Sequence, residues 1–159
     1  YFSREILPKV LQQFPDAKLY IVGAEPTEAL RRLHNGKSVV VTGRVDDIRP
    51  YIARSSVYVV PLRLGAGIRG KILEAWASRK PVVATTLSAA GLYRRHEENI
   101  LLADSPERFA DAILRLFRDP SLRTKLGENG LTICRDEYDW SAQVNKHEAL
   151  YSNLFKTLH

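Results

Sequence analysis

The sequence predicts an α/β protein, a Rossmann-like three-layer sandwich in which helices cover both faces of a parallel sheet. Short apolar, β-branched runs alternate with segments of helical period, which is typical of βαβ units. The apolar runs are also continuous, as expected for strands that are buried on both faces of a parallel sheet. The expected strands are 18–22, 39–42, 57–60, 81–85 and 100–102.

Segments of helical period separate these runs, and three further helices are expected after the last strand. Ser105 followed by Pro106 is typical of a helix start, with a serine cap and a proline in the first turn. Asp46 or Asp47 is expected to cap another helix. Tyr138 and Trp140, at a break in the pattern, are interpreted as core anchors. The expected helices are 1–8, 27–33, 46–54, 69–78, 105–117, 122–137 and 141–154.

Length and composition exclude several classes of protein. The 159 residues are 45% hydrophobic and 26% charged, which fits one globular domain covering 1–159. The longest apolar runs, such as 57–62, fall far short of the ~20 residues of a membrane-spanning helix. A single cysteine, Cys134, excludes an intramolecular disulfide framework and a thiolate-rich metal site. The histidines lack ligand-like spacing, so no metal is expected; they are His34, His96, His147 and His159.

The charge balance indicates a basic surface. The net charge is +6, from 24 Lys and Arg residues against 18 Asp and Glu residues. This charge either aids solubility or attracts an anionic partner, such as a nucleotide phosphate or an acidic membrane surface. No block of like charges marks a nucleic-acid-binding arm, so nucleic acid is not an expected partner.

The segment 61–75 is the most informative part of the sequence. It runs from the end of the third strand through a loop of small residues into a helix N-terminus. Small residues let the backbone approach a ligand, and the free N–H groups of a helix start attract an anion. The basic residues Arg63, Arg69 and Lys71 add positive charge. Together these features favour a diphosphate ligand.

Glu74 follows this loop inside the helix. Helical side chains lean toward the N-terminus, so its carboxylate can point back to the loop and accept bonds from a ribose diol. The alternative is a solvated glutamate that pairs with Lys71 or Arg69 at helical spacing. The pattern alone leaves both interpretations open.

Five stretches carry a resemblance to a known family. They read FPDAKLYIVG at 14–23, VTGRVDDIRPY at 41–51, VVPLR at 59–63, KILEA at 71–75 and PVVAT at 81–85. In order and spacing they resemble the C-terminal, donor-binding half of retaining glycosyltransferases with the GT-B fold. The closest likeness is to family-four transferases of bacterial polysaccharide biosynthesis, and it covers nearly the whole chain.

The resemblance implies a site for a nucleotide-sugar donor. The family has two glutamates with seven intervening positions: the second matches Glu74, which would hold the ribose hydroxyls, and the first falls on Ala66. Sugar contacts would then come from backbone amides of the loop. Relatives often carry glycine where Arg79 stands. The implied donor-binding residues are Gly43, Arg44 and Val45 beside the nucleobase, then Gly65, Ala66, Gly67, Ile68, Arg69, Lys71 and Glu74.

The resemblance also implies a reaction and partners. The whole enzyme would transfer a sugar from an NDP-sugar, with retention, to an acceptor sugar or lipid-linked glycan held by an N-terminal domain. No metal or other cofactor is expected, and no catalytic residue is identified. The sequence has no methionine, so we expect a fragment that lacks the N-terminal domain and the first strand of this domain. The resulting strand edge could self-associate, and the expected location is the cytoplasm, free or at the inner face of the membrane.

Other functions stay open at this point. Ala66 in place of the first motif glutamate motivates a non-catalytic nucleotide-sugar-binding or regulatory domain on the same fold. A GT-B sugar-nucleotide epimerase would share the donor site but would need acidic and histidine side chains that are not evident. A dinucleotide-dependent oxidoreductase is disfavoured, because no G-x-G-x-x-G follows the first strand.

Overall fold

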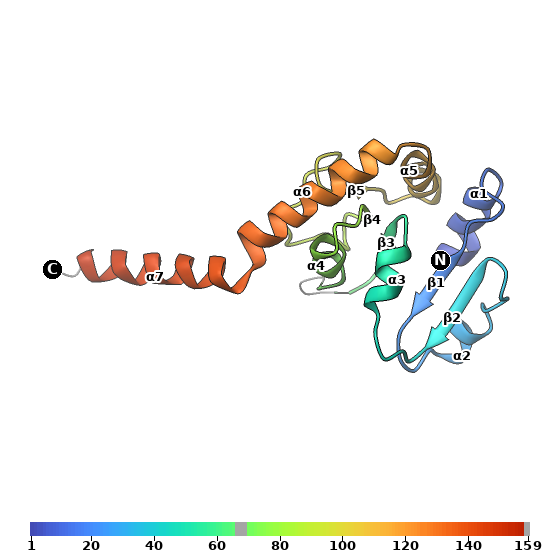
Figure 1. Cartoon of the computed structure of the whole chain (residues 1–159), viewed down its shortest axis with the longest axis horizontal. Helices are drawn as coiled ribbons and strands as arrows, with labels where there is room; N and C mark the ends of the chain where they lie inside the picture. Colours follow the sequence, from blue (N-terminus) through green and yellow to red (C-terminus); the bar gives the residue numbers. More distant parts are fainter. Residues whose placement is uncertain (66–69, 158–159) are drawn as a thin grey trace.

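The computed structural model describes residues 1–65 and 70–157 and confirms the predicted α/β architecture (Figure 1). Within these residues every strand lies within one residue of its predicted bounds. The strands are β1 (Leu19–Val22), β2 (Val39–Gly43), β3 (Tyr58–Val60), β4 (Val82–Ala84) and β5 (Leu101–Leu102).

The helices also follow the predicted order, with two displaced starts. The helix expected at 122–137 begins two residues earlier, at Pro120. The helix expected at 46–54 begins only at Arg49, because the Asp47 carboxylate accepts the backbone N–H of Arg49 at 2.9 Å ahead of the helix. The helical segments are the π-helical η1 (Phe2–Ile6), α1 (Leu7–Leu11), α2 (Glu28–Arg31), α3 (Arg49–Arg54), α4 (Gly70–Ala77), α5 (Pro106–Arg118), α6 (Pro120–Tyr138) and α7 (Trp140–Thr157).

The strands form two hydrogen-bonded parallel sheets, which differs from the single sheet predicted. One contains β1 and β2, and the other has the order β3-β4-β5. In the part of the chain that the structure describes, no ladder joins β1 to β3. In a doubly wound sheet of order 3-2-1-4-5-6, these groups would fill positions 3-2 and 4-5-6.

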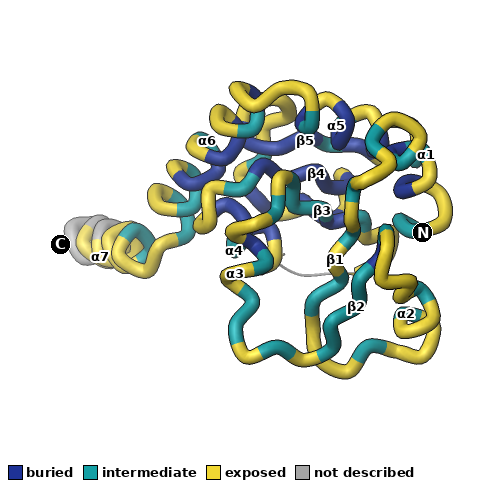
Figure 2. The backbone as a smooth tube through the Cα atoms, turned by 45° about the vertical axis from the view of Figure 1, so that its right-hand side comes forward, coloured by how far each residue is buried: buried dark blue, intermediate teal, exposed yellow. Residues whose placement is uncertain are grey.

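The three-layer arrangement is clearest around β4. Val83 packs on one side, in a cluster with η1, α1, α5 and α6. Val82 and Ala84 point to the other side, into a cluster with α4. This alternation is the period of a strand that is buried on both faces, and Figure 2 shows the buried backbone between the helices. The helices on both sides hold the sheet in place.

The end of α4 shows how the helix terminates at Arg79, where the resemblance implies glycine. Arg79 itself adopts the left-handed conformation, with φ 55°. Its N–H donates to the Trp76 carbonyl and that of Lys80 to the Ala75 carbonyl, each at 2.9 Å. These bonds are typical of a Schellman termination. The helix α4 therefore ends in a Schellman motif, but its left-handed position holds a residue with a Cβ, which strains the backbone there.

The last two helices meet where the sequence predicts a break, but only one aromatic residue anchors the core. The Tyr138 hydroxyl accepts the Tyr93 N–H at 2.8 Å, and Tyr138 packs against the α4 cluster. The interpretation of Trp140 as a core anchor is wrong, since it is 86% exposed. It begins α7, which extends away from the other elements (Figure 1). No helix in the described part is long and apolar enough to cross a membrane.

We expect Arg79→Gly to raise the free energy of unfolding by about 0.5–1 kcal/mol, because glycine adopts the left-handed conformation without a Cβ penalty. Urea unfolding measures the change. Arg79→Ala is the matched control, since it also removes the exposed ion pair with Glu128 (3.6 Å) but keeps the Cβ. Equal stability of the two variants would contradict this account of the α4 terminus.

Candidate functional site

The loop that leaves β3 is the first part of the candidate site. The structure describes it from Pro61 to Gly65 and resumes at Gly70, where α4 begins. Gly65 has φ 126°, a conformation that favours glycine. Four predicted site residues lie outside the described residues: Ala66, Gly67, Ile68 and Arg69.

Lys71 and Glu74 lie on α4, which the core holds against the sheet through the fully buried Ile72 and Trp76. Lys71 is exposed and Glu74 is half-buried. In the described part of the chain, no ion pair joins Glu74 to Lys71, so that form of the solvated-pair alternative is not observed. Burial raises the pKa of the Tyr58 hydroxyl, and the charge of Glu74 raises it further.

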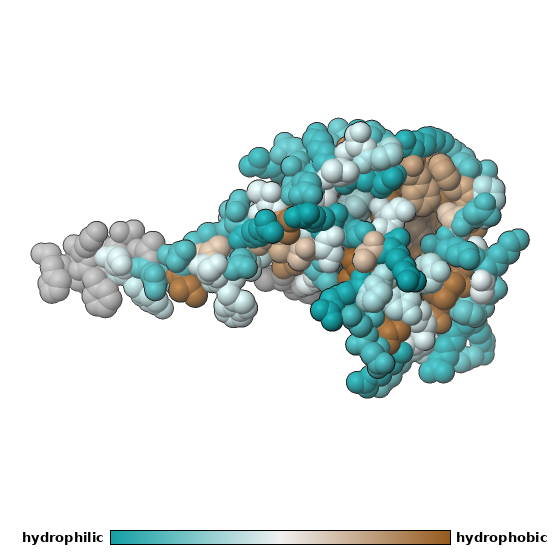
Figure 3. Space-filling model, viewed as in Figure 1, coloured by the Kyte–Doolittle hydropathy of each residue, from teal (hydrophilic) through white to brown (hydrophobic). Residues whose placement is uncertain are grey.

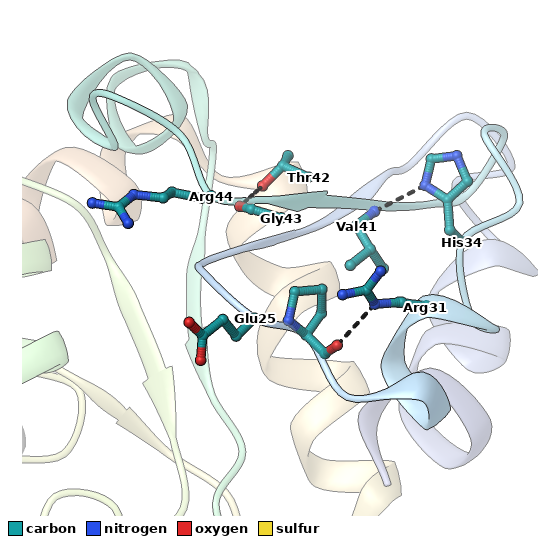
Figure 4. A pocket seen from close by; sticks show the side chains of 8 residues that line it. Glu25, Arg31, His34, Val41, Thr42, Gly43 and Arg44 are labelled. Carbon is teal, nitrogen blue, oxygen red and sulfur yellow. Dashed lines mark hydrogen bonds between the residues drawn. The ribbon is translucent and has the colours of Figure 1, made fainter.

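A second part of the site is an open hollow of about 470 Å³ beside the end of β2 (Figure 4). Gly43 ends the strand with φ 73°, and Arg44 follows it. Glu25, in the loop after β1, also has a positive φ of 50°. The lining residues are Glu25, Pro26, Arg31, His34, Val41, Thr42, Gly43 and Arg44.

Two hydrogen bonds connect residues that line this hollow. The Arg31 Nε donates to the Pro26 carbonyl at 3.0 Å, and the His34 Nδ1 accepts the Val41 N–H at 3.1 Å. Figure 4 shows these side chains on one side of the hollow, whereas Arg44 extends toward the other. The Glu25 carboxylate extends to the same side as Arg44, so a cation and an anion lie on that side of the hollow.

The structure brings only some of the predicted residues together. Gly43 and Arg44 share the hollow, which is not lined by Val45 or by the described residues of the β3–α4 segment. Sequence reasoning missed the contributions of Glu25 and Arg31. The available signal was the loop after Gly23, which follows the first predicted strand and therefore lies at a carboxyl end.

A third loop at the carboxyl ends of the strands follows β4, and hydrogen bonds join it to the segment after β5. The Thr86 N–H and hydroxyl each donate to one oxygen of the Asp104 carboxylate at 2.8 Å. Arg94 donates to the Thr86 carbonyl at 3.3 Å. Among the described residues, no group of His, Cys, Asp and Glu side chains is arranged to hold a metal ion.

Comparison with known proteins identifies the family. The family model described as "Glycosyl transferases group 1" matches residues 1–119. This chain belongs to that family. The lipopolysaccharide core biosynthesis glycosyltransferase LpsE of Rhizobium meliloti is 34% identical over 133 residues, covering 78% of this chain and 38% of LpsE. A phosphatidyl-myo-inositol mannosyltransferase of Mycobacterium leprae is 31% identical, covering 94% of this chain and 41% of the relative. The chain thus spans about two fifths of these relatives.

Solved glycosyltransferases share the fold. HepE of Anabaena, crystallised with UDP, superposes with a TM-score of 0.76 at 20% identity, covering 92% of this chain and 44% of HepE. The C-terminal domain of the group 1 glycosyl transferase LpcC from Francisella tularensis gives a TM-score of 0.68 at 24% identity, covering 82% of this chain and 74% of that domain. The predicted resemblance to the C-terminal half of a GT-B glycosyltransferase is confirmed.

We expect Gly43→Ala to lower the free energy of unfolding by about 1 kcal/mol, because a side chain at φ 73° is strained. No atom lies within 4 Å of the added Cβ, so the loss would come from the backbone alone. Gly23→Ala is the control: its Cβ also meets nothing within 4 Å, and its φ is not positive. Equal urea midpoints for the two variants would contradict a strained turn at the hollow.

Proposed function

We propose that this domain binds the nucleotide-sugar donor of a glycosyltransferase in polysaccharide or glycoconjugate biosynthesis. One observation carries the proposal. A glycine-containing loop leaves the buried strand β3 and leads into α4, with Glu74 inside the helix. Ligands of open α/β sheets bind outside the carboxyl ends of the strands, and a helix start favours a phosphate.

In this proposal each loop recognises a different part of the donor. The amides and cations of the 61–71 segment neutralise the diphosphate, and Glu74 accepts hydrogen bonds from the ribose diol. Gly43, Arg44 and Val45 flank the nucleobase beside the hollow. Fixed amide dipoles and cations can stabilise a leaving diphosphate without a metal ion, so we propose metal-independent transfer with retention.

The relatives support this class of reaction. Their names describe lipopolysaccharide core assembly and mannosyl transfer to a phosphatidyl-inositol lipid, and a structural neighbour was crystallised with UDP. We propose that an N-terminal domain holds the acceptor, a sugar or a lipid-linked glycan. The +6 charge is consistent with a cytoplasmic enzyme that works at the inner face of the membrane.

A second candidate is a non-catalytic nucleotide-sugar-binding domain on the same fold. Ala66 supports it, because it stands where the family has a glutamate that contacts the donor sugar. Both candidates predict donor binding and differ only in turnover. Assay of the whole protein with Ala66→Glu separates them: a gain from no transfer to measurable transfer would favour the non-catalytic interpretation of the natural sequence.

We expect the chain to bind one of UDP, GDP and ADP selectively in ligand-observed NMR, and to bind NAD more weakly. Glu74→Ala should weaken that binding about tenfold or more, because hydrogen bonds to a charged group contribute roughly 1.5–3 kcal/mol. Glu148→Ala, an exposed change of the same charge on α7, is the control. Equal binding of all four ligands, or unchanged binding by Glu74→Ala, would contradict a donor site here.

A further inference from the structure

Two buried hydroxyl groups lie at the carboxyl end of β4. Thr85 is 3% exposed and Ser88 is fully buried, and their oxygens are 2.7 Å apart. Buried hydroxyls need hydrogen-bond partners, because an unpaired one costs free energy. Their partners are not in the neighbouring helices but in the loop that leaves β3.

The two hydroxyls close a ring of hydrogen bonds on one residue of that loop. The Thr85 hydroxyl donates to the Leu62 carbonyl at 2.6 Å, and the Leu62 N–H donates to the Ser88 oxygen at 3.1 Å. The Ser88 hydroxyl also lies within donating distance of the Leu62 carbonyl, at 3.4 Å, so either hydroxyl can be the donor between Thr85 and Ser88. The Ser88 N–H donates to the Thr85 oxygen at 3.1 Å. In either direction each of the three residues both accepts and donates, and such chains of hydrogen bonds strengthen one another.

Leu62, whose backbone this ring holds, is a loop residue and not part of a strand. The residue is 40% exposed, and it lies beyond the last residue of β3, so no strand ladder holds its backbone. The ring holds both of its backbone polar groups instead. The next residue, Arg63, places its guanidinium 5.0 Å from the centre of the Tyr1 ring. The start of the loop is thus held by side chains from two distant segments.

We infer that Thr85 and Ser88 are positioning residues for the donor diphosphate. The inference rests on the proposed function, which places the diphosphate at this loop. Being buried, the two hydroxyls do not touch the ligand themselves. They fix the backbone of Leu62, so that the amides of 63–65 and the Arg63 guanidinium are held at the carboxyl edge of the sheet. A preorganised loop avoids the ordering cost that a mobile loop would incur on binding.

The test compares a nucleoside diphosphate with its monophosphate. We would titrate the chain with UDP and UMP, or with GDP and GMP if guanine is preferred, and follow binding by NMR. Thr85→Val and Ser88→Ala should each weaken diphosphate binding about tenfold, and monophosphate binding by about twofold or less. Because either change opens the same ring, the double variant should bind no more weakly than the singles.

Three controls separate positioning from general stability. Thr85→Ser keeps the hydroxyl and should restore diphosphate binding. Ile113→Val removes a buried methyl group from the core cluster around α5. It should leave the ratio of the diphosphate and monophosphate affinities unchanged. Hydrogen exchange of the Leu62 amide needs no ligand and should accelerate in Ser88→Ala, which also serves if Thr85→Val does not fold.

The outcomes distinguish this inference from the proposed function. Equal losses for the diphosphate and the monophosphate, or an unchanged Leu62 amide in Ser88→Ala, would overturn the positioning role while leaving donor binding intact. A chain that binds neither nucleotide, yet shows a slowly exchanging Leu62 amide, would overturn the proposed function and the positioning role with it. Variants that lose affinity for the diphosphate but not for the monophosphate, together with faster exchange of the Leu62 amide in Ser88→Ala, would support both proposals.

Discussion

The burial of β4 on both faces is the constraint on which the other elements depend. All three of its residues, Val82–Ala84, are completely buried, and the strand pairs with β3 on one side and β5 on the other. Helices must therefore cover both faces, and polar residues can follow only where the strand ends. Thr85 and Thr86 are the first of these, and their bonds tie the loop after β3 and the segment after β5 to the same edge.

Much of this fold could be predicted because the strands of a parallel sheet are continuous apolar runs in the sequence. The expectation that every strand is buried on both faces holds for β4 but is wrong for β1, where Tyr20 is 50% exposed. Each strand is a continuous apolar run, so its bounds are evident within one residue. Pairing between strands leaves no such trace in an apolar run, so the order of the strands and their division into two sheets had to come from the structure. The interpretation of Trp140 as a core anchor was wrong for a related reason. An aromatic residue beside a helix break fits a core anchor or a projecting helix equally well, and only tertiary packing decides.

The candidate site shows a similar division. The positions of Gly43 and Arg44 at the end of β2, and of Glu74 inside α4, could be predicted because they lie in short motifs that follow strands; their role in donor binding stays a prediction. The hydroxyl ring could not be predicted, because Leu62 and Ser88 are 26 positions apart and hydroxyl residues carry no periodic signal. A motif therefore indicates candidate residues, and only the structure shows which distant residues hold the loop.

The central claim is that a nucleotide diphosphate binds at the carboxyl edge of the strands. Mapping backbone amide shifts of the ¹⁵N-labelled chain during a nucleotide titration tests it most directly. The account predicts that the largest shifts fall at 42–45, 61–65 and 70–74. A second hollow, lined by residues such as His96 and Arg115 beside α5, provides the contrast. Shifts concentrated there, with the three loops unchanged, would contradict the account.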